Sequence, residues 1–179
     1  MSVRPNPVRS KASDKVLEES CDRPMTAPLK QVLLLVPPQD LSSGEVVLRF
    51  VRVVPGEPAR GCVPYFHFRI LTAQGSEVGH INFRVGDTEH VRVCAGHIGF
   101  EILEPFRGHG YALQACRAIA PFVRLVYKSV AMTCDPDNFA STRTLERLGA
   151  RFVDEVAVPP NDPHYQRGSR RKRRYRWTP

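Results

Sequence analysis

The residues Arg107 to Ala112, with the sequence RGHGYA, combine two glycines with the expected start of a helix. Gly108 and Gly110 allow positive φ angles or a close approach of the backbone to a ligand. A helix that begins at Tyr111 would direct its unpaired N–H groups and the positive end of its dipole at an anion. This pattern predicts a cradle for the phosphates of a cofactor.

The spacing of these glycines excludes two common phosphate-binding motifs. A Walker loop requires G-x-x-x-x-G-K-[ST] and a dinucleotide fingerprint requires G-x-G-x-x-G, whereas this segment has one G-x-G with no Lys-Ser or Lys-Thr after it. The pattern that fits is R-x-x-G-x-A, formed by Arg107, Gly110 and Ala112 after the strand end Ile102-Leu103. This segment resembles the acyl-CoA loop of the GNAT superfamily of N-acyltransferases.

A second segment supports the same resemblance. A strand-like VAMTC at 130–134 is followed by DPDNFAS and a short helix that ends in LGARF. Many members carry the series Asn-x-x-Ser, helix, Gly, Phe, which is matched here by Asn138, Ser141, Gly149 and Phe152. The two motifs cover roughly residues 97 to 153 in the order of the family. The preceding strand pair is also similar to bacterial GNAT proteins of unassigned substrate, through Pro64, Gly79, His97 and Gly99.

The resemblance implies an N-acetyltransferase that moves an acetyl group from acetyl-CoA directly to the primary amine of a small molecule or peptide. The pantetheine arm of the cofactor would pair in a gap between the strand end at 102–103 and the strand at 130–134. The backbone N–H groups of 107–112 would surround its pyrophosphate. The residues implied to contact the cofactor are Ile102, Leu103, Arg107, Gly108, His109, Gly110, Tyr111, Ala112, Asn138 and Ser141.

Acyl transfer to an amine needs a proton acceptor, because an alkyl amine with a pKa near 10.4 is mostly protonated at neutral pH. Alternation along 97–103 places His97 and Glu101 on the face expected to line the cleft, and both are candidate catalytic residues. Two structural readings stay open: a hydrogen-bonded strand histidine, and a carboxylate that holds an arginine. The family implies that a backbone N–H near Leu103 polarises the thioester carbonyl.

One position departs from the family pattern. Many members place a tyrosine seven residues after the helix-opening Asn138 to protonate the departing thiolate, and here that residue is Leu145. Tyr111, Tyr165, Tyr175 or water remain as sources of this proton. The missing tyrosine leaves an alternative function, a non-catalytic module that binds acyl-CoA or associates with nucleic acid.

The elements that must position these residues follow from hydrophobic patterning. Order is expected to begin with the apolar run at 31–36. Strands are expected at 45–54, 65–71, 77–85, 97–103, 130–134 and 151–156, and helices after Gly110 and Asn138. Pro121 predicts a bend or an early end in the first helix, and 86–95 reads as a polar loop. The fold class is α/β (α+β), a GNAT-like mixed, mostly antiparallel sheet of about six or seven strands flanked by a few helices. Little sequence remains for the helix pair that many members place between their first two strands.

Composition sets the domain organisation. Residues 1–30 hold four prolines and few aliphatic side chains, which predicts a mobile arm, and residues 31–179 are expected to form one domain. Five scattered cysteines argue against disulfides, and Cys94-x-x-His97 lacks a second pair for a metal site. With no apolar run of membrane-spanning length and no signal peptide, a cytoplasmic protein without membrane contact is expected.

The C-terminus carries most of the positive charge. Seven basic residues lie between Arg167 and Arg176, and without them the formal charge of +8 falls to +1. The segment 167–179 could close the sheet as a last strand, or could bind a polyanion through its charge and its aromatic side chains. The oligomeric state is left open, a homodimer included.

Overall fold

The computed structural model describes residues 35–39 and 41–179. The arm expected over residues 1–30 lies outside the described residues, as does most of the apolar run at 31–36. Of that run, Leu35 packs against the core and Val36 is exposed, and neither lies in a strand.

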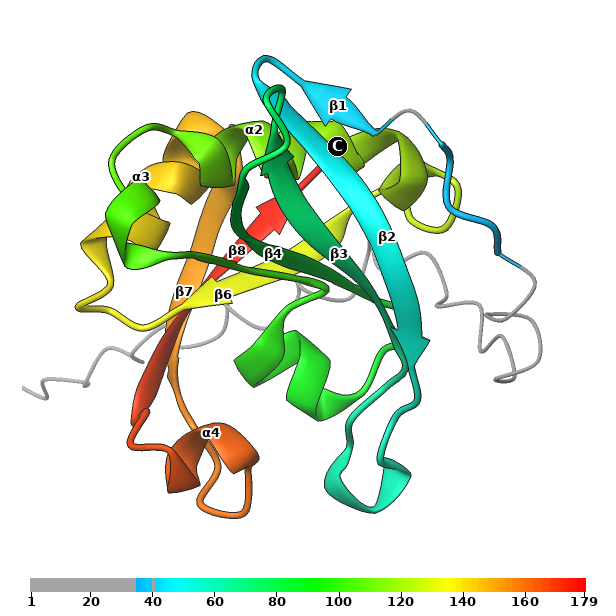
Figure 1. Ribbon diagram of the computed structural model, residues 1–179. Coiled ribbons are helices and arrows are strands. Elements are labelled where there is room, and N and C mark those ends of the chain that lie inside the picture. The colour runs from blue at the N-terminus through cyan, green and yellow to red at the C-terminus, as the bar shows by residue number, and fades with distance from the viewer. Residues whose placement is uncertain (1–34, 40) are drawn as a thin grey trace, which may run out of the picture.

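Five antiparallel strands form the first sheet in chain order (Figure 1). They are β1 (Ser42–Ser43), β2 (Val46–Val54), β3 (Tyr65–Thr72), β4 (Glu77–Arg84) and β5 (Ile98–Ile102). Alternation decides which face is buried: Phe66, Phe68 and Ile70 of β3 are almost completely inaccessible, while the residues between them are not. The strands predicted at 45–54, 65–71, 77–85 and 97–103 are confirmed.

Three further strands form a second antiparallel sheet in the order β6-β8-β7. They are β6 (Val130–Cys134), β7 (Arg151–Ala157) and β8 (Arg171–Trp177). The described residues thus hold eight strands in two sheets, against the six or seven expected in one, and the mostly antiparallel GNAT-like architecture is as predicted.

The basic C-terminal segment is a strand, and it occupies the middle of the second sheet. Tyr175 and Trp177 of β8 are buried in the core. Charges on β8 are largely paired across the sheet with acids of β7 and with Asp135 after β6. The ion pairs are Arg171–Glu155, Lys172–Asp135, Arg173–Glu155 and Arg174–Asp154.

Two helices cover one face of the sheets, α2 (Tyr111–Arg124) and α3 (Phe139–Arg147). Phe122 of α2 contacts Phe66 and Phe83 edge-on, with ring centroids 4.9 and 5.3 Å apart. The apolar side of α2 is therefore part of the core. Of the bend or early end predicted at Pro121, the early end is wrong: the helix continues to Arg124, with the proline on its exposed side.

The opposite face carries only short helical segments. They are η1 (Pro58–Arg60), the π-helical turn η2 (His90–Ala95) and α4 (Pro163–Gln166), while η3 (Glu104–Phe106) follows β5. The prediction of a polar loop over 86–95 is wrong at η2. This segment is a helical turn, and its Val91 and Cys94 side chains are buried. Between β1 and β3 the described residues contain no helix except η1. No helix in the described part of the chain is long and apolar enough to cross a membrane.

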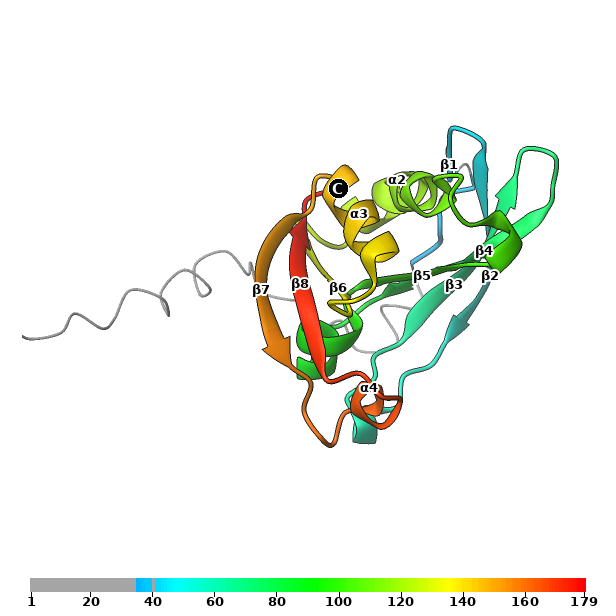
Figure 2. The ribbon, with the colours of Figure 1, turned by 90° about the vertical axis from the view of Figure 1, so that its left-hand side faces the viewer.

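The two sheets meet at β5 and β6 and then diverge (Figure 2). The N–H of His97 donates to the Ala131 carbonyl at 2.7 Å, and the Ala131 N–H donates to Nδ1 of the His97 ring at 3.1 Å. No strand pairing joins β5 to β6 beyond this junction. Figure 2 shows α2 and α3 on one side of the divergence and α4 on the other.

Candidate active site

The turn from β5 into α2 exposes an unpaired helix N-terminus. Gly108 and Gly110 have φ angles of 87° and 77°, so the positive values predicted for both are confirmed. Gly110 is the N-cap of α2 and provides no side-chain hydrogen bond to the first turn. A Cβ at either glycine would meet nothing within 4 Å. The first N–H groups of α2 therefore face an open space that suits an anion.

A cavity of about 520 Å³ lies between this turn and α3. Three arginines line it, Arg107 from the turn and Arg143 and Arg147 from α3, against a single carboxylate, that of Glu101. This excess of positive charge suits a polyphosphorylated ligand. Sequence analysis missed Arg143 and Arg147, although their spacing of four residues on a helix would have shown that they share a face.

Most of the residues implied to contact the cofactor line this cavity. They are Ile102, Arg107, Gly108, Gly110, Tyr111, Ala112, Asn138 and Ser141. His109 does not; its ring stacks on that of Tyr111 with centroids 5.6 Å apart. Leu103 does not either, and its N–H donates to the Val78 carbonyl at 2.9 Å. The backbone donor expected near Leu103 is therefore already used within the sheet.

Asn138 joins the capping of α3 to the wall of the cavity. Its side-chain oxygen accepts a hydrogen bond from the Ser141 N–H at 3.0 Å, the arrangement of a helix N-cap. Asn138 is thus the N-cap of α3. This capping role does not exclude ligand contact, since both residues face the cavity.

A second cavity of about 190 Å³ adjoins the first and fills the divergence between β5 and β6. Both cavities are lined by Phe100, Asn138 and Ser141. The buried apolar residues Ile98, Met132 and Leu145 line part of the second cavity. Its polar lining comes from β4, the end of β6, α4 and β8, namely Arg84, Thr133, Asp135, His164 and Lys172.

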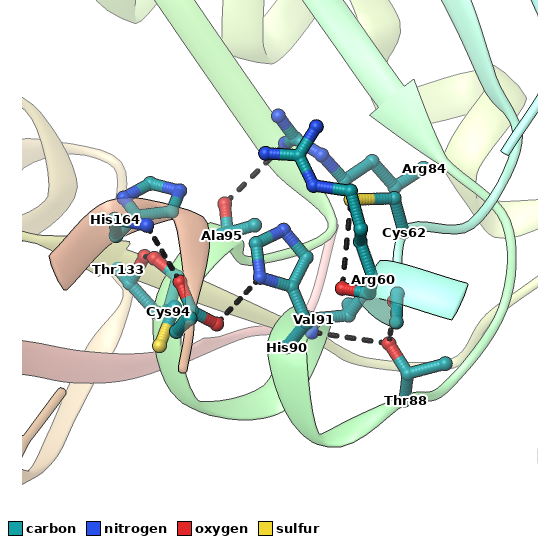
Figure 3. A network of polar contacts seen from close by, with 12 residues as sticks. Arg60, Cys62, Arg84, Thr88, His90, Val91, Cys94, Ala95, Thr133 and His164 are labelled. Atoms are coloured by element: carbon teal, nitrogen blue, oxygen red, sulfur yellow. Dashed lines mark hydrogen bonds and ion pairs between the residues drawn. The ribbon is translucent and has the colours of Figure 1, made fainter. Parts of the chain in front are cut away.

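A network of polar contacts connects η2 to the other elements that line the second cavity (Figure 3). The Thr133 hydroxyl donates to the Cys94 carbonyl at 2.6 Å, which ties η2 to β6. Nδ1 of His90 lies 2.7 Å from the buried Asp162 carboxylate, which ties η2 to the start of α4. Burial raises the pKa of the Cys94 thiol to about 12, so this cysteine stays protonated.

Charges in the second cavity are mostly compensated. Lys172 is buried, and its Nζ lies 2.8 Å from Asp135. Burial by itself would raise the pKa of Asp135, but hydrogen bonds from Lys172 and Ser169 outweigh it and hold that pKa below its usual range. Burial and the nearby Lys172 lower the pKa of His164 to about 4, so its ring is neutral at pH 7.

The polar face of the first sheet carries Glu101 beside two histidines that sequence analysis missed. The Glu101 carboxylate lies 4.0 Å from Nε2 of His80, its partner across β4 and β5. The His67 ring lies 5.4 Å from the His80 ring. Burial is the main cause that lowers the pKa of His80. Alternation on β3 and β4 puts both histidines on the non-core face, but only the strand register brings His80 to Glu101.

His97 has different surroundings from Glu101. Its side chain is buried, packs edge-on against Tyr127 at 4.8 Å, and accepts the Ala131 N–H at the sheet junction. Burial lowers its pKa to about 4. His97 lines neither cavity. Across the described residues, no group of three His, Cys, Asp or Glu side chains is placed to hold a metal ion.

The candidate proton donors also lie apart from one another. Tyr111 lines the first cavity, Tyr165 stacks beneath Arg170, and Tyr175 is buried in the core. Leu145, at the position where a tyrosine was expected, is 1% exposed and packs in the core while contributing to the wall of the second cavity. No tyrosine lines the second cavity.

Comparison with known proteins gives a family match and several structural neighbours. The model of the acetyltransferase (GNAT) domain matches residues 33–151. A GNAT-family acetyltransferase from Bacillus anthracis is 24% identical with a TM-score of 0.49, over 63% of this chain and 65% of its own. The ribosomal-protein-S5-alanine acetyltransferase from Vibrio fischeri is 15% identical with a TM-score of 0.47, over 64% and 61%.

The microcin C7 self-immunity acetyltransferase, solved with acetyl-CoA and AMP, is 18% identical with a TM-score of 0.48, over 64% of this chain and 61% of its own. The chain thus spans less than two thirds of each of these three proteins. No curated protein matches it by sequence. Because the family model covers more than half of the chain and the fold agrees with it, the chain belongs to the GNAT family of acetyltransferases.

Proposed function

We propose that this protein transfers an acetyl group from acetyl-CoA to a primary amine in a ternary complex. The observation that carries the proposal is the arginine-lined cavity at the glycine turn, which continues into the divergence between β5 and β6. The N–H groups at the start of α2, with Arg143 and Arg147, would hold the phosphates. The thioester arm would lie along the free edges of β5 and β6.

The second cavity gives the acceptor its own approach. It runs from Asn138 and Leu145, near α3, to His164 and Lys172, near α4. Donor and acceptor would therefore meet from opposite sides of the sheets, with no need for one to leave before the other binds. This arrangement favours direct transfer within a ternary complex.

When bound, acetyl-CoA supplies an activated thioester carbonyl. We assign removal of the amine proton to Glu101, and the neutral His80 ring, 4.0 Å away, offers that proton a route to solvent. The amine nitrogen then forms a C–N bond to the carbonyl carbon as the C–S bond breaks. Because Leu145 brings no hydroxyl, we expect water to protonate the departing thiolate. We give His97 the role of holding the sheet junction.

Two other roles stay as competing proposals. Leu145 in place of a tyrosine keeps open a non-catalytic module that binds acyl-CoA. A polyanion partner for Arg167 to Arg176 also stays open, although most of the charge on β8 is paired across the sheet. The acceptor as a small molecule or a peptide, the cytoplasmic location and the homodimer remain predictions.

The deciding experiment incubates the protein with isotopically labelled acetyl-CoA and a pool of small amines and peptides, followed by mass spectrometry. We expect the label in an amide product at a rate above that of the uncatalysed reaction. Tight binding of acetyl-CoA without any labelled product would select the non-catalytic module instead.

A further inference from the structure

Arg84 is a cation at the second cavity without an acidic partner. It is the last residue of β4, and its Nη1 donates to the Ala95 carbonyl at 3.3 Å (Figure 3). The same Nη1 donates to the Gly96 carbonyl, also at 3.3 Å. Its guanidinium lies 5.8 Å from the centre of the Tyr65 ring. Within the described part of the chain, no carboxylate forms an ion pair with Arg84. Burial lowers its pKa, as expected for a charge withdrawn from water without a counter-ion.

The strand opposite Arg84 leaves room for its guanidinium. Gly99 on β5 pairs with Asn82 of β4, and a Cβ built on Gly99 would lie 2.9 Å from Nη1 of Arg84. Any side chain at this position would displace the guanidinium from the wall of the cavity. The missing side chain at Gly99 therefore lets Arg84 lie against β5 inside the divergence of the sheets.

The charged residues that line the second cavity have a net charge of +1 at pH 7. Lys172 and Asp135 form an ion pair, and the His164 ring is neutral at pH 7. The positive charge of Arg84 is thus the uncompensated charge in the lining of a cavity of about 190 Å³. A monoanion such as a carboxylate balances it, and guanidinium matches the two oxygens of a carboxylate.

We propose that Arg84 binds a carboxylate of the acceptor, so that the protein acetylates amines that carry a carboxylate on the same small molecule. This inference rests on the proposed function, because it places the amine at Glu101, which lines the first cavity, while the carboxylate lies in the adjoining second cavity. Gly99 and Glu101 are two residues apart on β5 and share a face, a separation of about 7 Å. The preferred acceptor then has its amine and carboxylate about 7 Å apart.

The same geometry discriminates against other amines. A diamine would bring its second cation to Arg84, and a plain alkylamine would leave the guanidinium without a partner. A phosphate group would bring a second negative charge that the lining does not balance. The phosphates of the donor have their own cluster at Arg143 and Arg147, in the other cavity.

The test measures kcat/KM with labelled acetyl-CoA for a ladder of ω-amino acids and for the alkylamines, diamines and aminoalkyl phosphonates of matching length. We expect ω-amino acids to exceed the alkylamines by roughly 10- to 100-fold. The optimum should have roughly four or five methylenes, the length that spans the separation along β5. Equal rates for amino acids and alkylamines, or a preference for phosphonates, would overturn the carboxylate assignment.

Variants locate the effect. Arg84→Gln should abolish the preference, Arg84→Lys should keep part of it because the charge remains without the planar fork, and Gly99→Ala should weaken it by displacing the guanidinium. Arg49→Gln is the matched control, an exposed arginine of the same sheet outside both cavities. A preference that survives Arg84→Gln would refute the role of Arg84.

Calorimetric titration of the best-fitting ω-amino acid, with and without saturating CoA, separates this inference from the proposed function. If no amine is acetylated, the proposed function fails, while binding of the amino acid to wild type and its loss in Arg84→Gln would still support the carboxylate site. If transfer occurs but the amino acid binds Arg84→Gln as tightly as wild type, the inference alone fails.

Discussion

His97 and Glu101 lie four residues apart, yet their surroundings give them different chemistry. The His97 ring is buried and accepts a backbone N–H from Ala131, whereas the Glu101 side chain is well exposed beside His80. A group that transfers protons must reach its substrate, and Glu101 meets this condition. A hydrogen bond that joins two sheet edges is stronger when it is shielded from water, and the buried His97 ring provides such a bond.

The first prediction concerns the stability that His97 provides. His97→Leu leaves the Ala131 N–H without its acceptor, so the free energy of unfolding at pH 7 should fall by about 1 to 3 kcal/mol. Urea unfolding monitored by circular dichroism measures this loss. His109→Leu, at an exposed histidine, is the control and should unfold within about 0.5 kcal/mol of wild type.

The pH dependence of the same variant gives a second readout. The pKa of His97 is about 4 in the folded protein against an ordinary 6.5, so the unfolded chain takes up the proton first. Wild-type stability should therefore fall as the pH drops from about 6.5 toward 4. His164 contributes with the same sign in both proteins, so a shallower fall in His97→Leu isolates His97. Parallel curves would show that the His97 ring does not stay neutral.

The second prediction concerns proton transfer. Glu101→Gln should lower kcat by roughly 10²- to 10⁴-fold and leave the KM for acetyl-CoA nearly unchanged, because a base acts in the transition state. His80→Gln should cause a smaller loss of kcat, since His80 acts through Glu101. Steady-state kinetics with an amine acceptor measures both. A Glu101→Gln enzyme with wild-type kcat would leave positioning of an already neutral amine as the source of rate.

At the scale of elements, β8 holds the second sheet together. It pairs with β6 on one edge and β7 on the other, and it brings Tyr175 and Trp177 into the core. Its basic side chains pair with acids of β7 and with Asp135, so they also stabilise the sheet. Losing this strand would leave two unpaired edges, a known cause of aggregation.

The third prediction follows from this position. Truncation after Gln166 should give an insoluble protein, because β6 and β7 lose their common partner. Removal of Thr178 and Pro179 alone, beyond the end of β8, is the control and should leave the protein soluble. Soluble fractions after expression measure both. A soluble and fully active truncation after Gln166 would mean that the strand is not required.

Local patterns predict these elements better than they predict the cavities. Alternation identifies β3 and β4, and the glycine pattern identifies the turn into α2, because both depend on neighbouring residues. The turn η2 was missed because its buried side, Val91 and Cys94, occupies too few positions to show a helical period. Arg84, His164 and Lys172 reach one cavity from three distant segments, so no spacing in the sequence reveals them.

At the scale of the whole molecule, two sheets that separate beyond a single junction are bordered by two adjoining cavities. The helices α2 and α3 border the first cavity, and η2 with α4 borders the second. Under the proposed function, acetyl-CoA should bind at the turn before α2 independently of any acceptor.

The most direct test is the effect of acetyl-CoA on the melting temperature of wild type and two glycine variants. At about a hundredfold excess over Kd, a ligand of the folded state adds about 2.7 kcal/mol, or about 5 to 10 °C for a chain of this size. Gly110→Asp should abolish this shift by placing a carboxylate where the phosphates bind. Gly75→Asp is the matched control, with a similar positive φ and equally open space in the β3–β4 turn, and should keep the full shift. A folded Gly110→Asp protein that acetyl-CoA stabilises as much as wild type would contradict the account.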